Sequence, residues 1–360
     1  MKAKRNLFLR AARHAFSGVV CAGAVLLFAA SAQSQNLFVT DFWSGNVYEF
    51  TPGGVRTTFA SGFTGPSGLA FNNAGNLFIG NEINGNLSGT NIIYGNSVTE
   101  ITPDGTQSTF AFPVDEPRGL AFDSAGDLFV ANAVPNSVYE IKPDGTQSTF
   151  ASGGLSYPDA LAFNSAGDLF VANFFGSTVY EYTPGGVQST FASGLSLSLP
   201  GAFLPTGLAF DSAGNLFVAD GSTGNIYEFT PAGTESIFAS GFDSPSGLVF
   251  DSAGDLFVAE YGNGNIYKIA PGGVRSIFAS GLDGPMALAF QPVPELVAAV
   301  TNGAIQVAVT MPSPYYSTIV QVSTDVVNWT SVYTNTPPFT FTDSMGTTLP
   351  CRFYRAMLAP

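Results

Sequence analysis

The stretch from residue 205 to residue 241, PTGLAFDSAGNLFVADGSTGNIYEFTPAGTESIFASG, decides the fold. It holds four runs of four to seven residues that are rich in Phe, Val, Ile, Tyr and Thr, at 207–210, 216–220, 225–229 and 235–241. Gly, Pro, Asn and Asp separate these runs, which is the pattern of short β-strands joined by tight turns. The stretch therefore predicts a unit of four strands.

This unit recurs six times along the chain with small changes. Its first run begins at positions that are 40 to 51 residues apart, namely Gly68, Gly119, Ala160, Gly207, Gly247 and Ala287. A period of roughly 40 residues with four antiparallel strands per unit predicts an all-β fold, the β-propeller. The second run reads Leu-Phe-Val or Leu-Phe-Ile without polar alternation, so both faces of that strand must be covered, as stacked blades would do.

The two ends of the repeat region predict a closed ring. A second run at 37–39 has no first run before it, and the repeats stop after a first run at 287–290 with no second run following. The six units are complete only if the last first-run strand pairs with the earliest second-run strand. We therefore predict a six-bladed propeller over residues 33–290. A straight solenoid is the alternative, and it would need a polar cap at each end.

The run from Pro205 to Asp220, with five variants elsewhere, resembles the NHL-type repeat of bacterial secreted propellers. It also resembles repeats of the gluconolactonase and regucalcin group and of the streptogramin lyases. The gluconolactonase likeness implies a divalent metal held by Glu, Asn and Asp just before the inner strands, where only Asp159 matches. The lyase likeness implies a histidine, and the one histidine, His14, lies in the N-terminal segment 1–32. The resemblance therefore implies the fold more strongly than an activity.

Composition limits the location and the partners. Only 11% of the 360 residues are charged, and the formal net charge is −14, which argues against nucleic acid and anionic membranes as partners. Residues 1–32 combine a basic start, an apolar stretch and the small residues Ala30-Ser31-Ala32, as a secretory signal peptide does. We expect cleavage after Ala32 and a monomeric protein that is secreted, periplasmic or on the cell surface, without membrane insertion. An uncleaved membrane anchor is the alternative.

The C-terminal 70 residues differ from the repeats. Pro292 and Pro294 mark a linker at 291–295, and alternating apolar runs from residue 304 onward predict a small β-sandwich over 296–360. The stretches 322–330 and 352–356 are similar to fibronectin-like modules appended to secreted bacterial proteins. Such a module would serve attachment or spacing.

The loops after the second strands and before the first strands vary most, and repeat proteins commonly bind ligands on such a face. Oxygen-bearing side chains end the second run of every unit: Asp41, Asn81, Asn132, Asn173, Asp220 and Glu260. They could hold a hard cation or a polar ligand, or each could cap its own loop. Aromatic residues follow three of them: Phe42, Trp43, Phe174, Phe175 and Tyr261. These rings suit stacking on a sugar or a peptide, or they could seal the blade tops.

A second set precedes the first run of each unit: Ser67, Arg118, Asp159, Thr206, Ser246 and Met286. We interpret the chain as an exported binding or scaffold protein that engages a glycan, peptide or protein through the variable loop face, with no catalytic set and no cofactor. The alternative is a metal-dependent lactonase or related hydrolase in which Asp159, Asp220 and Glu260 hold a divalent cation such as calcium. A surface-structural role is the third hypothesis.

Overall fold

The computed structural model describes residues 18–21, 24–26, 35–84, 93–193 and 204–292, and the C-terminal ranges 295–301, 304–310, 318–323, 330–335, 339–343 and 351–358. The chain divides into two compact units, of which one comprises residues 36–72 and 76–291. The other comprises residues 1–35, 73–75 and 292–360. No helix in the described part of the chain is long and apolar enough to cross a membrane.

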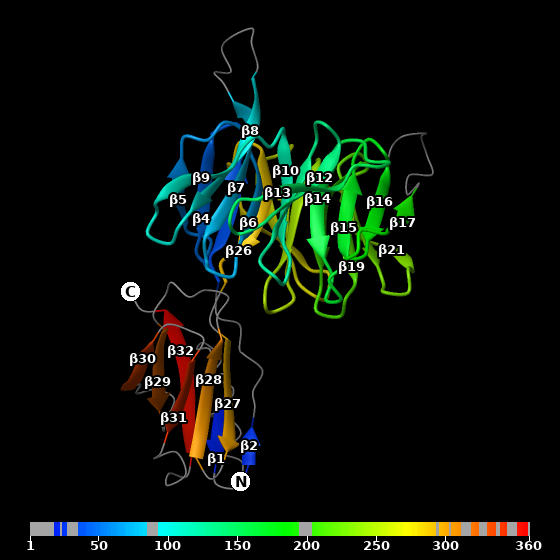
Figure 1. Cartoon of the computed structure of the whole chain (residues 1–360). Helices are drawn as coiled ribbons and strands as arrows, with labels where there is room; N and C mark the ends of the chain where they lie inside the picture. Colours follow the sequence, from blue (N-terminus) through cyan, green and yellow to red (C-terminus); the bar gives the residue numbers. More distant parts are fainter. Residues whose placement is uncertain are drawn as a thin grey trace. The chain divides into compact units, whose positions relative to one another are not determined.

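Six four-stranded antiparallel sheets, the blades of a β-propeller, make up the first unit (Figure 1). From inner to outer strand, the first three blades are as follows: blade 1, β26 (Pro285–Phe290), β3 (Leu37–Asp41), β4 (Asn46–Phe50) and β5 (Arg56–Ser61); blade 2, β6 (Pro66–Phe71), β7 (Leu77–Asn84), β8 (Ile93–Ile101) and β9 (Gln107–Ala111); blade 3, β10 (Pro117–Phe122), β11 (Leu128–Asn132), β12 (Ser137–Ile141) and β13 (Gln147–Ala151). The other three blades follow the same order: blade 4, β14 (Pro158–Phe163), β15 (Leu169–Asn173), β16 (Thr178–Tyr182) and β17 (Gln188–Ser193); blade 5, β18 (Pro205–Phe210), β19 (Leu216–Asp220), β20 (Asn225–Phe229) and β21 (Glu235–Ala239); blade 6, β22 (Pro245–Phe250), β23 (Leu256–Glu260), β24 (Asn265–Ile269) and β25 (Arg275–Ala279).

The inner strands form a closed ring. Each contacts the next in the order β6, β10, β14, β18, β22 and β26, and β26 contacts β6 again. Blade 1 joins the two ends of the repeat region, because β26 pairs with β3 and places Leu288 opposite Val39 and Phe290 opposite Leu37. The prediction of a six-bladed ring closed by its C-terminal strand is confirmed.

The hydrophobic core lies between neighbouring blades. The second strand is buried along its whole length in five blades, as the absence of polar alternation predicts. Its phenylalanine packs edge-on against the phenylalanine that ends the inner strand of the next blade, as Phe217 does against Phe250 with ring centroids 4.9 Å apart. Phe257 and Phe290 repeat this contact at 5.1 Å where blade 6 meets blade 1. The closing interface is thus packed like the others.

Glycine begins the first run in four of the six units because the inner strands approach one another closely. A Cβ atom on Gly207 would lie 1.9 Å from the carbonyl oxygen of Ser246, and one on Gly68 would lie 1.9 Å from that of Arg118. Real Cβ atoms do not come so near to backbone oxygens, so at these two positions only glycine permits the spacing. The close approach sets the width of the ring and hence of the space at its axis.

The described residues of the second unit form two antiparallel sheets. One has the order β2 (Ala24–Leu26), β1 (Gly18–Cys21), β32 (Cys351–Leu358), β29 (Thr318–Ser323) and β30 (Thr330–Asn335). The other has the order β27 (Glu295–Thr301), β28 (Ala304–Thr310) and β31 (Phe339–Asp343), and β27 contacts both β1 and β32. In the structure of residues 1–360, part of the predicted signal peptide therefore pairs with β32. Cleavage after Ala32 stays a prediction, and it would remove β1 and β2 from the sheet.

Candidate functional site

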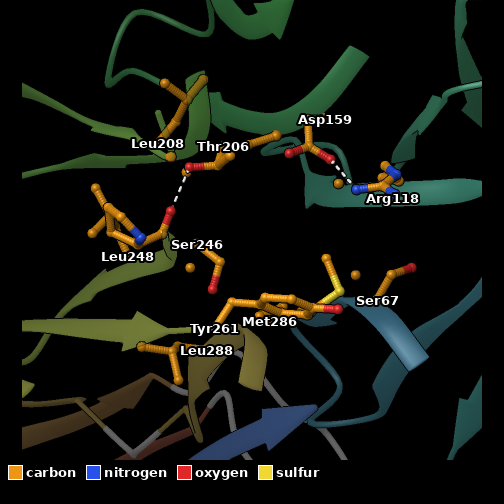
Figure 2. A pocket seen from close by; sticks show the side chains of 18 of the residues that line it. Ser67, Arg118, Asp159, Thr206, Leu208, Ser246, Leu248, Tyr261, Met286 and Leu288 are labelled. Carbon is orange, nitrogen blue, oxygen red and sulfur yellow. Dashed lines mark hydrogen bonds and ion pairs between the residues drawn. The ribbon is translucent and has the colours of Figure 1, made fainter. Parts of the chain in front are cut away.

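A cavity of about 400 Å³ lies where the inner strands begin, and Figure 2 shows its side chains arranged around an open centre. Its volume falls in the range of small-molecule sites. The residue before the first run of every unit lines it: Ser67, Arg118, Asp159, Thr206, Ser246 and Met286. The pseudo-sixfold repeat therefore brings this second sequence-predicted set together at one place.

Leucines provide much of the apolar lining. Each inner strand contributes one, two residues beyond the lining position named above: Leu69, Leu120, Leu161, Leu208, Leu248 and Leu288. All six are buried. Three aromatic side chains from the loops after the second strands complete this part of the cavity, namely Phe42, Phe174 and Tyr261.

The hydroxyl groups in the cavity join neighbouring blades. Ser67 donates a hydrogen bond to the carbonyl oxygen of Pro117 at 2.5 Å, and Thr206 donates one to that of Pro245 at 2.6 Å. Ser246 does the same to the following blade at 2.9 Å. Each acceptor belongs to the first residue of the next inner strand. The protons of these hydroxyls are therefore used in hydrogen bonds that join neighbouring blades.

Between blades 3 and 4 a charged group stands in place of the hydroxyl bridge, and it also reaches blade 2. Arg118 donates from Nη1 to Asp159 Oδ1 at 2.8 Å and from Nη2 to Glu82 Oε1 at 2.6 Å, and its guanidinium lies 4.6 Å from the ring centre of Tyr157. Figure 2 shows Arg118 and Asp159 side by side on the cavity wall. The three charged side chains come from β10, β14 and β7, so the group spans three blades.

The environment of this group perturbs its titration. Burial raises the pKa of the Glu82 and Asp159 carboxyls above their ordinary values, although the nearby Arg118 charge pulls both pKa values down. Burial also works against the Arg118 charge, but Asp159 and Glu82 outweigh it and hold the pKa of Arg118 above its ordinary value. Among the described residues, Glu82 Oε2 and Arg118 Nε are buried and find no hydrogen-bond partner. The group therefore keeps one carboxylate oxygen and one N–H that could still take part in a hydrogen bond.

The oxygen-bearing residues that end the second strands do not line this cavity. Four of them accept a hydrogen bond from a backbone N–H in the loop before the inner strand of their own blade: Asp41 from Asp283 at 2.9 Å, Asn173 from Ser156 at 2.5 Å, Asp220 from Leu204 at 3.1 Å and Glu260 from Asp243 at 2.8 Å. They thus anchor that loop. Asp220 also accepts from the backbone N–H groups of Ser222 and Thr223, so it caps its own loop as the alternative interpretation expects.

The remaining two members of that set differ. Asn81 donates from Nδ2 to the hydroxyls of Ser97 and Thr99, at 3.3 and 2.9 Å. Asn132 is fully buried, and within the described ranges neither its amide oxygen nor its amide nitrogen has a hydrogen-bond partner. Neither side chain reaches the cavity lining.

The predicted aromatic set divides in two. Phe42, Phe174 and Tyr261 line the cavity, whereas Trp43 and Phe175 are 48% and 65% exposed. Each exposed ring contacts its lining neighbour, with centroids 4.8 Å apart for Phe42 and Trp43 and 4.9 Å apart for Phe174 and Phe175. Two adjacent pairs therefore offer one ring inside the cavity and one outside.

The three predicted metal ligands are not brought together as a cluster. Asp159 pairs with Arg118 in the cavity, while Asp220 and Glu260 hold loop backbone groups of blades 5 and 6. In the part of the chain that the structure describes, no three acidic, histidine or cysteine side chains are grouped so that they could hold a metal ion. The calcium prediction therefore depends on Asp159 alone within the cavity.

Sequence reasoning did not identify Glu82 as a functional residue or Arg118 as the centre of an ion-pair group. Arg118 is the one basic residue at a position that elsewhere holds Ser, Thr, Met or Asp. This exception was the feature of the sequence that could have indicated a charged group at the cavity. Its partner Glu82 lies 36 residues away and directly follows Asn81, the end of the predicted second run. Only the ring brings the two together.

No family model and no curated protein matches the chain. Solved structures do match. A chain of a nidogen/laminin complex is 16% identical with a TM-score of 0.60, over 71% of this chain and 98% of that chain. Virginiamycin B lyase from Staphylococcus aureus is 15% identical with a TM-score of 0.52, over 78% and 89%. A protein assigned as a gluconolactonase is 16% identical with a TM-score of 0.52, over 71% and 88%. At these identities the likeness shows the propeller fold.

Proposed function

We propose that the chain is an exported binding protein whose propeller takes a ligand into the axial cavity on its variable loop face. The observation that carries this proposal is the cavity itself, in which one position from each of the six blades converges beside three aromatic rings. Such a concave, largely apolar space with a few polar groups is the usual form of a ligand site. A glycan, a peptide or a protein segment would enter with one residue or one head group in the cavity.

The structural neighbours support binding as a use of this fold. One of them comes from a nidogen/laminin complex, and a catalytically inactive virginiamycin B lyase is seen with quinupristin. Export rests on the predicted signal peptide at 1–32. The hydrogen bonds of the cavity hydroxyls to backbone carbonyls favour binding over catalysis, because these groups already hold the ring.

A thermal-shift screen of glycans, peptides and metabolites tests the proposal. We expect at least one compound to raise the melting temperature of the wild-type protein, because a ligand that binds only the folded state stabilises it. Phe174→Ala should reduce that shift, since Phe174 lines the cavity. Phe175→Ala is the matched control, because its ring is 65% exposed outside the cavity. Equal shifts in the two variants would place binding elsewhere.

The alternative of a metal-dependent lactonase draws on the gluconolactonase neighbour and on Asp159 in the cavity. It requires calcium or a similar cation to bind beside a guanidinium that already pairs with this carboxylate. Calcium should then raise the melting temperature of the wild type and not of Asp159→Asn. An unchanged melting temperature with calcium would count against this alternative.

A further inference from the structure

We infer that the ligand of the axial cavity is an organic cation, an ammonium group carried on a compact apolar body. This inference rests on the proposed function, because it names the chemical class that the same cavity would recognise. It follows from three observations: the charge balance around Arg118, which lines the cavity, the aromatic rings of the lining, and the hydrogen bonds that the lining hydroxyl groups already donate to backbone carbonyls.

The charge balance favours a cation. Two carboxylates, Glu82 and Asp159, flank the single guanidinium of Arg118, at 2.6 and 2.8 Å. Burial raises the pKa of the nearby Glu116 carboxyl, while the Arg118 charge pulls that pKa down. Asp159 is the acidic member of the described cavity lining, and Glu82 and Glu116 lie next to Arg118 but outside the lining. Arg118 is the one basic residue in the described lining, and both of its Nη atoms already donate to carboxylates. An anionic ligand would therefore meet uncompensated negative charge, and a cation would offset it.

The ion-pair group exceeds what the ring needs. At three other junctions, between blades 2 and 3, 5 and 6, and 6 and 1, the same position makes a neutral hydroxyl-to-carbonyl hydrogen bond. One Arg–Asp pair would serve that structural purpose. The second carboxylate adds negative charge, and Glu82 is only 8% exposed while its Oε2 atom has no hydrogen-bond partner among the described residues. A buried, unsatisfied carboxylate oxygen is costly unless another group compensates it.

The rest of the lining matches an ammonium compound better than a sugar. Phe42, Phe174 and Tyr261 come from blades 1, 4 and 6, and aromatic faces attract cations. The six leucines offer an apolar surface for the body of the ligand. A sugar would instead need several free donors and acceptors, whereas the Ser67, Thr206 and Ser246 hydroxyls already donate to backbone carbonyls.

Four matched probes test the inference by isothermal titration calorimetry on the full-length protein: benzyltrimethylammonium, benzylamine, benzyl alcohol and benzoate. They share one aromatic ring and differ in charge. We expect the two cations to bind at least about tenfold more tightly than benzyl alcohol, and benzoate to bind most weakly. Glu82→Gln keeps the size of the side chain and an oxygen for Arg118. It should weaken the cations about tenfold while changing benzyl alcohol by less than about twofold.

Glu235→Gln is the control, because it removes the same charge from an exposed residue of the outer strand β21. It should leave all four affinities unchanged. Benzyl alcohol or benzoate binding as tightly as the cations to the wild type would overturn the inference and leave the proposed function standing. If none of the probes binds, the inference also falls, and a failed thermal-shift screen would then remove the proposed function as well. The wild-type order of affinities decides the matter even if a variant fails to fold.

Discussion

The Thr40→Val substitution tests how the ring is closed. Thr40 is fully buried in β3, and its hydroxyl donates to the carbonyl oxygen of Ser67 and accepts from the backbone N–H of Ala287, both at 2.9 Å. It thereby ties together β3, the closing strand β26 and the first residues of blade 2. The corresponding position in the other blades holds Gly80, Ala131, Ala172, Ala219 and Ala259. In blade 1 the inner strand β26 has Met286 at the position that holds Ser or Thr in blades 2, 5 and 6. The hydroxyl of this blade instead comes from Thr40 on the second strand.

Valine has nearly the shape of threonine but cannot make either hydrogen bond. The substitution leaves the half-buried N–H of Ala287 and the buried C=O of Ser67 without this partner. At about 1–3 kcal/mol for each, and allowing for the added methyl group, the free energy of unfolding should fall by about 2–4 kcal/mol. Urea unfolding followed by far-UV circular dichroism measures this loss as a lower midpoint with an unchanged slope.

Two further variants make the test specific. Thr40→Ser keeps the hydroxyl and should recover most of the stability. Thr109→Val makes the same chemical change on an exposed position of β9, and should alter stability by less than about 0.5 kcal/mol. If Thr40→Val unfolds at the same urea concentration as Thr109→Val, the hydroxyl does not hold the ring and this reasoning is wrong.

Two other predictions follow from the glycines and the buried carboxylates. Gly207→Ala should destabilise the propeller by more than about 2 kcal/mol, because the new Cβ would overlap the Ser246 carbonyl oxygen, whereas Gly272→Ala meets open space and should be close to neutral in the same urea assay. Burial raises the pKa of Glu82 and Asp159, so the native state binds their protons more tightly than the unfolded chain does. Their contribution is therefore fully present below the ordinary pKa values of 4.5 and 3.8 and is lost as pH rises through the native values. As the pH rises through the native pKa values, the melting temperature of Glu82→Gln should therefore fall less than that of the wild type. If the two proteins give parallel curves of melting temperature against pH, Glu82 does not make this contribution.

The sequence predicted the fold well because the information that specifies it is local and repeated. Each blade is encoded by one unit, and the unpaired runs at 37–39 and 287–290 indicated where the ring closes. The site was harder to predict. Asp220 and Glu260 were expected to converge on a ligand, but they end second strands, one strand spacing outside the ring, and there they hold loop amides. The cavity belongs to the inner strands, and so Asp159 alone of the three predicted metal ligands lines it.

The ion-pair group could not be predicted because its members are distant in sequence. Glu82, Arg118 and Asp159 lie in three different repeats, and no local pattern distinguishes a charge that faces the axis from one that faces solvent. Similarly, Phe174 and Phe175 are adjacent and chemically identical, yet one lines the cavity and the other is exposed. Such choices depend on loop conformation rather than on strand periodicity.

The construction of blade 1 from the two ends of the repeat region also affects biosynthesis. Strand β3 leaves the ribosome early, but its inner neighbour β26 is translated about 250 residues later. Until then the inner edge of β3 lacks its partner, and its unpaired N–H and C=O groups are open to pairing with another strand. The inner edge of β3 is therefore covered only after the last repeat has been made. A nascent chain that ends before β26 keeps this edge exposed.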